Sequence, residues 1–131
     1  MIVLDASAAV ELVLGTPAGH RVRRKLQASG PALHAPHLID LEVASALRSF
    51  ERSGAIRPAE AAGALALFGA LDIDRCEHAL LLPRIWQLRR NITVHDGAYI
   101  ALAELLRATV VTCDGNLARA PGHSAAVELV A

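Results

Sequence analysis

The chain has 131 residues, of which 53% are hydrophobic and 20% charged, and its 13 basic residues balance 13 acidic ones. This length allows one compact domain, which we expect to cover residues 1–131, and the composition excludes a disordered chain. Zero net charge gives no overall attraction to nucleic acid, so local clusters of basic residues would have to bind such a partner.

The chain opens on an apolar run, Met1 to Leu4, that ends at Asp5. The run predicts a short buried strand, and the residues after it predict a helix. Because Asp5 and Glu11 interrupt the apolar stretch and no basic residue precedes it, the segment fits neither a signal peptide nor a membrane span. We therefore expect a cytoplasmic protein, in which the distant Cys76 and Cys113 are reduced thiols.

The next segment predicts a helix, a strand and a second helix. Thr16 and Pro17 are typical of a helix start, and this helix should run to about Ser29. The short sequence ALHA then predicts a strand. Pro36 opens a long helix that should end at Gly54.

The middle of the chain continues this alternation. A helix rich in alanine and leucine is predicted from about Pro58 to Ala70, and LDIDRC after it predicts a partly buried strand. The next helix should run from about Glu77 to Arg90. Pro83 should either kink this helix or mark a broken first turn.

The last third contains one more helix and two strands. The segment TVHDGAYIALAELL predicts a helix, and the β-branched run Thr109 to Thr112 predicts a strand that leads to Asp114. DGNLARAPGH predicts a loop and AAVELV a final strand. Strands that alternate with helices in this way predict a three-layer α/β/α domain with a central, mainly parallel sheet.

Four acids can meet at one edge of this sheet. Asp5 and Asp114 follow strands, and such folds place their sites beyond the carboxyl ends of the strands. Asp96, in the first turn of its helix, and Glu42, on the polar side of its helix, can reach the same edge. Carboxylates so close would repel each other unless a cation neutralised them, and the hard ions Mg²⁺ and Mn²⁺ prefer oxygen ligands.

Each acid also has a local explanation. Asp96 fits a capping box with Thr93, and Glu42 can pair with Arg52 on its own helix. Asp5 and Asp114 fit turn or capping positions. The six histidines have no zinc-like spacing, and we expect His95 on the surface or behind the site.

The four acids lie in segments of distinctive sequence: MIVLDASAAVELVL, PHLIDLEVASALR, TVHDGAYIALAELL and ATVVTCDGNLARA. In this order, over nearly the whole chain, they resemble the PIN-domain ribonucleases, most closely the VapC-type toxins of bacterial toxin–antitoxin pairs. The resemblance implies a PIN-like fold and a catalytic site in which Mg²⁺, or Mn²⁺, is held by Asp5, Glu42, Asp96 and Asp114.

The resemblance further implies an endoribonuclease toxin that cleaves RNA phosphodiester bonds with a metal-activated water. Ser7, Thr112 and Asn116 would support the acids. The implied partners are the RNA substrate, a cognate antitoxin whose C-terminal segment wraps the toxin and places an arginine among the acids, and a second copy of the toxin. No membrane partner is implied.

Some surface features fit these partners. Basic clusters that can line the RNA path are formed by Arg21, Arg23, Arg24 and Lys25 and by Arg89 and Arg90. The apolar stretch from Ala61 to Leu71 fits a dimer or antitoxin groove, and ordinary core packing explains it equally well. Asp40, two residues from Glu42, faces another side of its helix and should be structural, as at a subunit contact.

Three other functions compete with this one. A receiver-like signalling domain also binds Mg²⁺ at strand ends, but it needs a lysine on a late strand, and the only lysine here is Lys25 in an early helix. An aspartate-nucleophile phosphatase would need a second aspartate where Ser7 stands. A catalytically inactive PIN-like binding module is the remaining alternative, and the complete set of acids argues against it.

Overall fold

Five parallel strands form the centre of the molecule. The computed structural model describes the backbone of residues 1–131 and every side chain except that of Ser29. The strand order is β3-β2-β1-β4-β5, so β1 occupies the middle of the sheet. All pairs are parallel. The strands are β1 Ile2–Leu4, β2 Leu33–Pro36, β3 Ile73–Cys76, β4 Thr109–Thr112 and β5 Ala126–Leu129.

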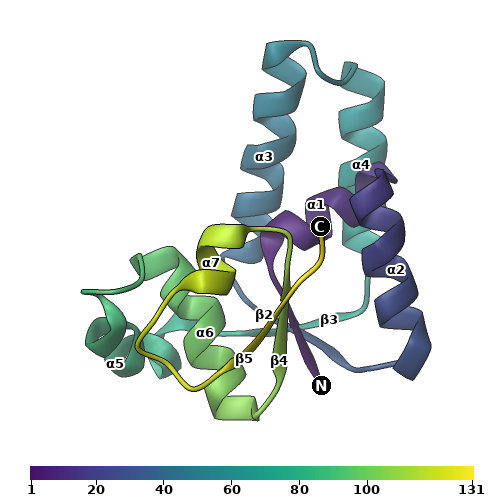
Figure 1. Ribbon diagram of the computed structural model, residues 1–131. Coiled ribbons are helices and arrows are strands. Elements are labelled where there is room, and N and C mark those ends of the chain that lie inside the picture. The colour runs from purple at the N-terminus through teal and green to yellow at the C-terminus, as the bar shows by residue number, and fades with distance from the viewer.

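Seven helices connect the strands in the described chain. They are α1 Ala6–Leu14, α2 Pro17–Ser29, α3 Ile39–Ser53, α4 Pro58–Ala70, α5 His78–Leu88, α6 Val94–Leu106 and α7 Gly115–Arg119. Figure 1 shows α1 and α2 on one side of the sheet and α5 and α6 on the other. The predicted three-layer α/β/α fold with a parallel sheet is confirmed.

Most predicted boundaries agree with the structure. Thr16 caps α2 by accepting a hydrogen bond from the backbone N–H of Gly19 at 3.0 Å. Gly54 ends α3 with a φ of 80°, a left-handed conformation that glycine adopts without steric cost. This turn lets α4 run back beside α3, and the two helices project from the sheet as a hairpin (Figure 1).

Two predictions about elements were wrong in detail, and one of two alternatives is excluded for a third. The long helix begins at Ile39, because Pro36 still pairs with Cys76 in the sheet. Helix α5 runs from His78 through Pro83, which excludes the broken first turn and leaves the predicted kink as the alternative. Residues 115–119 form α7 where a loop was predicted.

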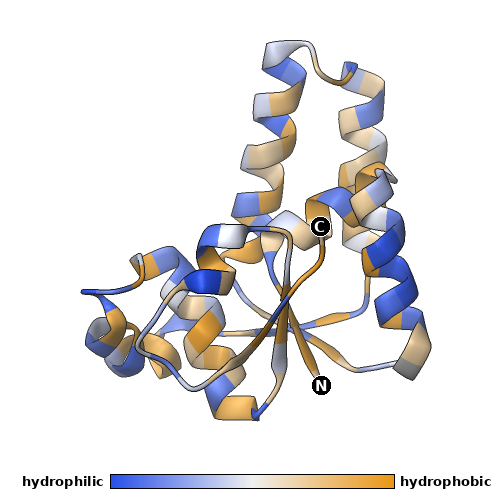
Figure 2. Cartoon of the chain, viewed as in Figure 1, coloured by the Kyte–Doolittle hydropathy of each residue, from blue (hydrophilic) through white to orange (hydrophobic). Residues whose placement is uncertain are grey.

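The hydrophobic core lies between the sheet and both helical layers. Figure 2 shows apolar residues along the central strands and a hydrophilic stretch along α2. Helix α6 is buried from Gly97 to Ala103 and packs on β1, β2 and β4. Rigid packing of this kind fixes where the first turn of α6, with Asp96, is placed. No helix in the described chain is long and apolar enough to cross a bilayer.

Candidate active site

The four predicted acids line one cavity of about 350 Å³. Asp5 and Asp114 come from the carboxyl ends of the neighbouring strands β1 and β4. Asp96 comes from the first turn of α6, and Glu42 from the first turn of α3. Residues that are far apart in sequence thus meet where parallel strands end, as such folds favour.

Asp5 is the most deeply buried of these acids, with 5% of its surface exposed. Its Oδ2 accepts hydrogen bonds from the hydroxyls of Ser7 and Thr112, each at 2.6 Å. The same hydroxyl oxygens accept the backbone N–H groups of Cys113 and Asp114, each at 2.9 Å. Each hydroxyl donates its one proton to Asp5, and its oxygen accepts a backbone N–H group. This network therefore joins the ends of β1 and β4 through Asp5.

Glu42 is held from a different element. Its Oε1 accepts a hydrogen bond from the phenol of Tyr99 on α6 at 2.7 Å. The predicted alternative, an ion pair with Arg52, is not found among the described side chains. Glu42 therefore faces the cavity with its position set by α6.

Asp96 and Asp114 combine a local role with a place in the cavity. Thr93 caps α6 by accepting the backbone N–H of Asp96 at 3.2 Å, which is half of the predicted capping box; the described residues show no return hydrogen bond from the Thr93 backbone to the Asp96 carboxylate. Asp114 caps α7, where its Oδ1 accepts the backbone N–H of Asn116 at 2.9 Å. This cap explains why α7 forms where a loop was predicted.

Three of the acids share one arrangement. In Asp5, Glu42 and Asp114, hydrogen bonds from the described residues reach one carboxylate oxygen and leave the other without a protein donor. Each carboxylate is therefore oriented by its neighbours and keeps one oxygen for a further ligand.

The acids also affect each other electrostatically. Burial raises the pKa of Glu42, the Tyr99 hydrogen bond opposes this rise, and the charges of Asp5 and Asp96 add to it. Burial likewise raises the pKa of Asp96, and the charges of Asp5 and Asp114 raise it further. The pKa of an acid rises beside other negative charges, so these shifts report mutual repulsion.

The described residues supply no arginine or lysine ion pair to this cluster. They also contain no group of three or more His, Cys, Asp or Glu side chains that could hold a metal ion as they stand. The acids line the cavity wall and do not form a closed shell of ligands.

The supporting residues predicted from the sequence divide into two groups. Ser7 and Thr112 contact Asp5 directly, as expected. The side chain of Asn116 accepts a hydrogen bond from Arg119 at 3.1 Å and does not line the cavity. His95 is exposed, and its charge opposes the rise in the pKa of Asp96, so it lies near the site without lining it.

Asp40 lies outside the cavity. Arg75 on β3 donates two hydrogen bonds to its carboxylate, at 2.8 and 2.9 Å. The pair joins α3 to the edge strand of the sheet, which agrees with the structural role expected for Asp40.

Three residues near the acids were missed by the sequence reasoning. Glu11 and Cys113 line the cavity, and Tyr99 contacts Glu42. A signal for Tyr99 exists in the sequence: it lies three residues after Asp96, and such residues share one face of a helix. A tyrosine within an apolar helix also needs a partner for its hydroxyl.

Comparisons with known proteins agree with this geometry. Residues 2–123 match the PIN domain family. Ribonuclease VapC12 of Mycobacterium tuberculosis is 47% identical over 131 residues, which cover 100% of both chains. Ribonuclease VapC1 of the same species is 39% identical over 129 residues, or 98% of this chain and 96% of that one.

A solved structure shows the same fold. The crystal structure of M. tuberculosis VapC20, described as a toxin that cleaves the sarcin-ricin loop, superposes with a TM-score of 0.63 at 19% identity. The match covers 90% of this chain and 93% of VapC20. With its full-length relatives, its family match and its fold, the chain belongs to the PIN-domain family and, within it, to the VapC proteins.

Proposed function

We propose that this chain is a divalent-metal-dependent endoribonuclease and the toxin of a toxin–antitoxin pair, acting in the cytoplasm as one domain of residues 1–131. The carrying observation is that the four predicted carboxylates, together with that of Glu11, line a single cavity and form no ion pair with the described arginines and lysines. The names of the full-length relatives, which are ribonucleases, support the choice of RNA as the substrate.

We assign the cation to Asp5, Glu42, Asp96 and Asp114, with Mg²⁺ as the first choice and Mn²⁺ as the second. When bound, such an ion activates a water nucleophile and neutralises charge that builds on the phosphate. Other residues of the chain orient the acids that would hold the ion. The hydroxyls of Ser7 and Thr112 orient Asp5, and the backbone at the start of α7 orients Asp114.

An acidic cavity repels RNA unless basic residues lie at its rim. Burial and the charges of Glu11 and Asp5 raise the pKa of the Cys113 thiol, and the charge of Arg21 opposes this rise, so Arg21 acts electrostatically on the cavity without lining it. Lys25, in the same predicted cluster, is paired with Glu128 on β5. We therefore propose that Arg21, in preference to Lys25, contacts the RNA.

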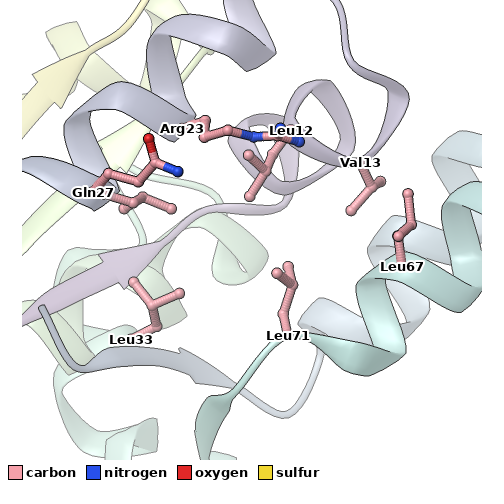
Figure 3. A pocket seen from close by; sticks show the side chains of 8 residues that line it. Leu12, Val13, Arg23, Gln27, Leu33, Leu67 and Leu71 are labelled. Atoms are coloured by element: carbon pink, nitrogen blue, oxygen red, sulfur yellow. The ribbon is translucent and has the colours of Figure 1, made fainter. Parts of the chain in front are cut away.

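An apolar groove supports the second part of the proposal, a protein partner. The groove has a volume of about 380 Å³ and lies between α1, α2, α4 and β2 (Figure 3). Leu67 is 58% exposed at its wall, and Arg23 reaches into it from α2. The groove is lined by Leu12, Val13, Arg23, Leu26, Gln27, Leu33, Leu67 and Leu71.

We assign this groove to an amphipathic segment of the antitoxin, with apolar residues toward the leucines and an acidic residue toward Arg23. Helix α1 lines both the groove and the acidic cavity, through Leu12 and Glu11 respectively. One bound segment can therefore cover the groove and continue to the acids. A second toxin copy is also expected, and occupation of the groove by that copy is the competing outcome.

Cleavage of RNA by the purified chain tests the enzymatic part. Activity should require Mg²⁺ or Mn²⁺ and disappear with a chelator. Asp96→Asn should abolish it, whereas Glu104→Gln, a change on the same helix outside the cavity, should retain it. Equal activity of wild type and Asp96→Asn would return Asp96 to a capping role.

Co-purification with the protein encoded beside this chain tests the groove. Leu67→Glu should prevent complex formation and leave RNA cleavage intact. Leu65→Glu is the matched control, because Leu65 is 46% exposed on the same helix but does not line the groove. If Leu67→Glu instead dissociates a homodimer and the complex persists, the groove belongs to the second copy.

A further inference from the structure

Tyr99 is the largest fully buried side chain in the core, with 0% of its surface exposed. A phenol in such a position needs a hydrogen-bond partner, because an unsatisfied buried hydroxyl is costly. Its partner is a cavity acid: the hydroxyl donates to Oε1 of Glu42 at 2.7 Å. This hydrogen bond connects the core of the molecule to Glu42 in the acidic cavity.

The position of Tyr99 on α6 makes this contact rigid. It lies one helical turn after Asp96, so α6 presents an acid and a hydroxyl toward the same region. The helix around it, from Gly97 to Ala103, is buried throughout. Glu42, which has three rotatable side-chain bonds, is therefore held against a closely packed part of the core.

We propose that Tyr99 is a positioning residue for the divalent cation: its hydroxyl holds Oε1 of Glu42 so that Oε2 faces the ion. This inference rests on the proposed function, since it needs a cation at the four acids. No described residue donates a hydrogen bond to Oε2 of Glu42, which leaves that oxygen for the ion.

The type of donor supports this role. An arginine or lysine would orient Glu42 equally well but would also cancel its charge, as Arg84 does for Glu104. A phenol orients the carboxylate without neutralising its negative charge, which remains available to bind the metal ion. Asp5 is oriented in the same way, by the neutral hydroxyls of Ser7 and Thr112.

Metal binding by the Tyr99→Phe variant tests this proposal without measuring activity. The full chain is melted at increasing Mn²⁺, and the midpoint, which is the Mn²⁺ concentration equal to the dissociation constant, is obtained by fitting the rise in Tm. Loss of a group that orients a metal ligand reduces metal affinity by roughly 10- to 100-fold, so the midpoint should increase by at least about 10-fold. A purely structural Tyr99 would lower the Tm without metal and leave the midpoint unchanged, which would overturn the proposal.

A double variant identifies the residue through which Tyr99 acts. In a Glu42→Gln background, adding Tyr99→Phe should leave the Mn²⁺ midpoint where Glu42→Gln alone puts it, because the two changes remove the same interaction. Independent, additive effects would contradict an action through Glu42. If the Tm of the wild type does not respond to metal, the proposed function fails together with the role of Tyr99. If wild type and Tyr99→Phe respond with the same midpoint, only the role of Tyr99 fails.

A second readout does not depend on the folding of a variant. Tyr99 is the only tyrosine of the chain, so wild-type protein labelled with 3-fluorotyrosine gives one ¹⁹F signal. We expect Mn²⁺-free protein to show a shift of this signal when Mg²⁺ saturates the site, and no shift in Glu42→Gln. A signal insensitive to Mg²⁺ in the wild type, while the Tm still rises, would overturn the role of Tyr99.

Discussion

Helix α6 carries an acid near each end, and the two have opposite properties. Asp96, in the first turn, lies among other acids, and burial and their charges raise its pKa. Glu104, near the last turn, accepts two hydrogen bonds from Arg84, at 2.8 and 3.0 Å. It also accepts the backbone N–H and the hydroxyl of Ser124, and these contacts lower its pKa to about 2.

The helix dipole cannot explain this difference, because it acts in the opposite sense at both ends. It favours a negative charge at the N-terminus and disfavours one at the C-terminus, by about 0.3–1 kcal/mol. Charge-assisted hydrogen bonds contribute about 1.5–3 kcal/mol each and outweigh it. Local partners therefore decide the state of each acid.

The comparison distinguishes a structural acid from an acid that awaits a ligand. Glu104 has a cation of the chain beside it, so its charge is balanced once the protein folds. Asp96 and the other cavity acids have no such partner in the described chain, and their charges are balanced only if a cation arrives from solution. The following predictions test this distinction, from the largest expected effect to the smallest.

Replacing the most buried cavity acid should have the largest effect. Asp5→Asn retains the shape of the side chain but removes the charge, and we expect RNA cleavage to fall by at least about 100-fold, the upper range for groups that only orient metal ligands. Initial rates of RNA cleavage at saturating Mg²⁺ measure this. Glu51→Gln, an exposed acid on α3 outside the cavity, should cleave at the wild-type rate. A reduction of less than 10-fold for Asp5→Asn would contradict a ligand role.

Glu104→Gln should destabilise the protein without affecting metal binding. The pKa of Glu104 is lowered on folding, so its stabilising effect is complete above the unfolded value of about 4.5 and disappears as the pH falls toward 2. Because Arg84 is 39% exposed, we discount the shift and expect a loss of about 1–3 kcal/mol at pH 7. Urea unfolding from pH 7 to pH 3 measures it. The difference from wild type should narrow as the pH falls, and a constant difference would rule out the ion pair as its cause.

Glu42→Gln should behave in the opposite way when metal is absent. The pKa of Glu42 is raised on folding, so its charge destabilises the folded state above that pKa, and removal of the charge should stabilise the metal-free protein by up to ~1 kcal/mol. Melting in a chelator and at millimolar Mn²⁺ measures the change. With metal, the wild type should become the more stable protein. A variant that is less stable in both conditions would show that repulsion is not the dominant effect.

The smallest effect is expected at Asp40. Its carboxylate is 48% exposed in the pair with Arg75, and pairs of this kind contribute about 0.2–1 kcal/mol. Asp40→Asn should therefore reduce stability slightly and leave both cleavage and metal binding unchanged. A change in the Mn²⁺ midpoint of this variant would show that Asp40 affects metal binding by Glu42, the other acid in the first turn of α3.

The sequence was sufficient to predict the fold and to predict that four acids lie at one edge of the sheet, because both depend on strong local signals. Apolar runs that end at Asp5 and near Asp114 mark strands at whose carboxyl ends sites form. Thr16 and Gly54 mark helix ends through their own chemistry. These features need no knowledge of distant contacts.

What the sequence could not give depends on distant partners. The hydrogen bond between Tyr99 and Glu42 spans 57 positions, and no local pattern pairs them. The short helix α7 depends on Asp114, which caps it and also lines the cavity. Asn116 was expected beside the acids from the resemblance to PIN-domain ribonucleases, but its side chain accepts a hydrogen bond from Arg119.

Metal-dependent melting of the wild type and of Asp96→Asn tests the central claim most directly. At a metal concentration 100-fold above the dissociation constant, binding to the folded state alone adds about 2.7 kcal/mol, which is a rise of several degrees in Tm. We predict this rise for the wild type and for Glu104→Gln in millimolar Mg²⁺ or Mn²⁺, and its loss in Asp96→Asn. A flat response of the wild type, or an equal rise in Asp96→Asn, would show that the cavity acids do not share a cation.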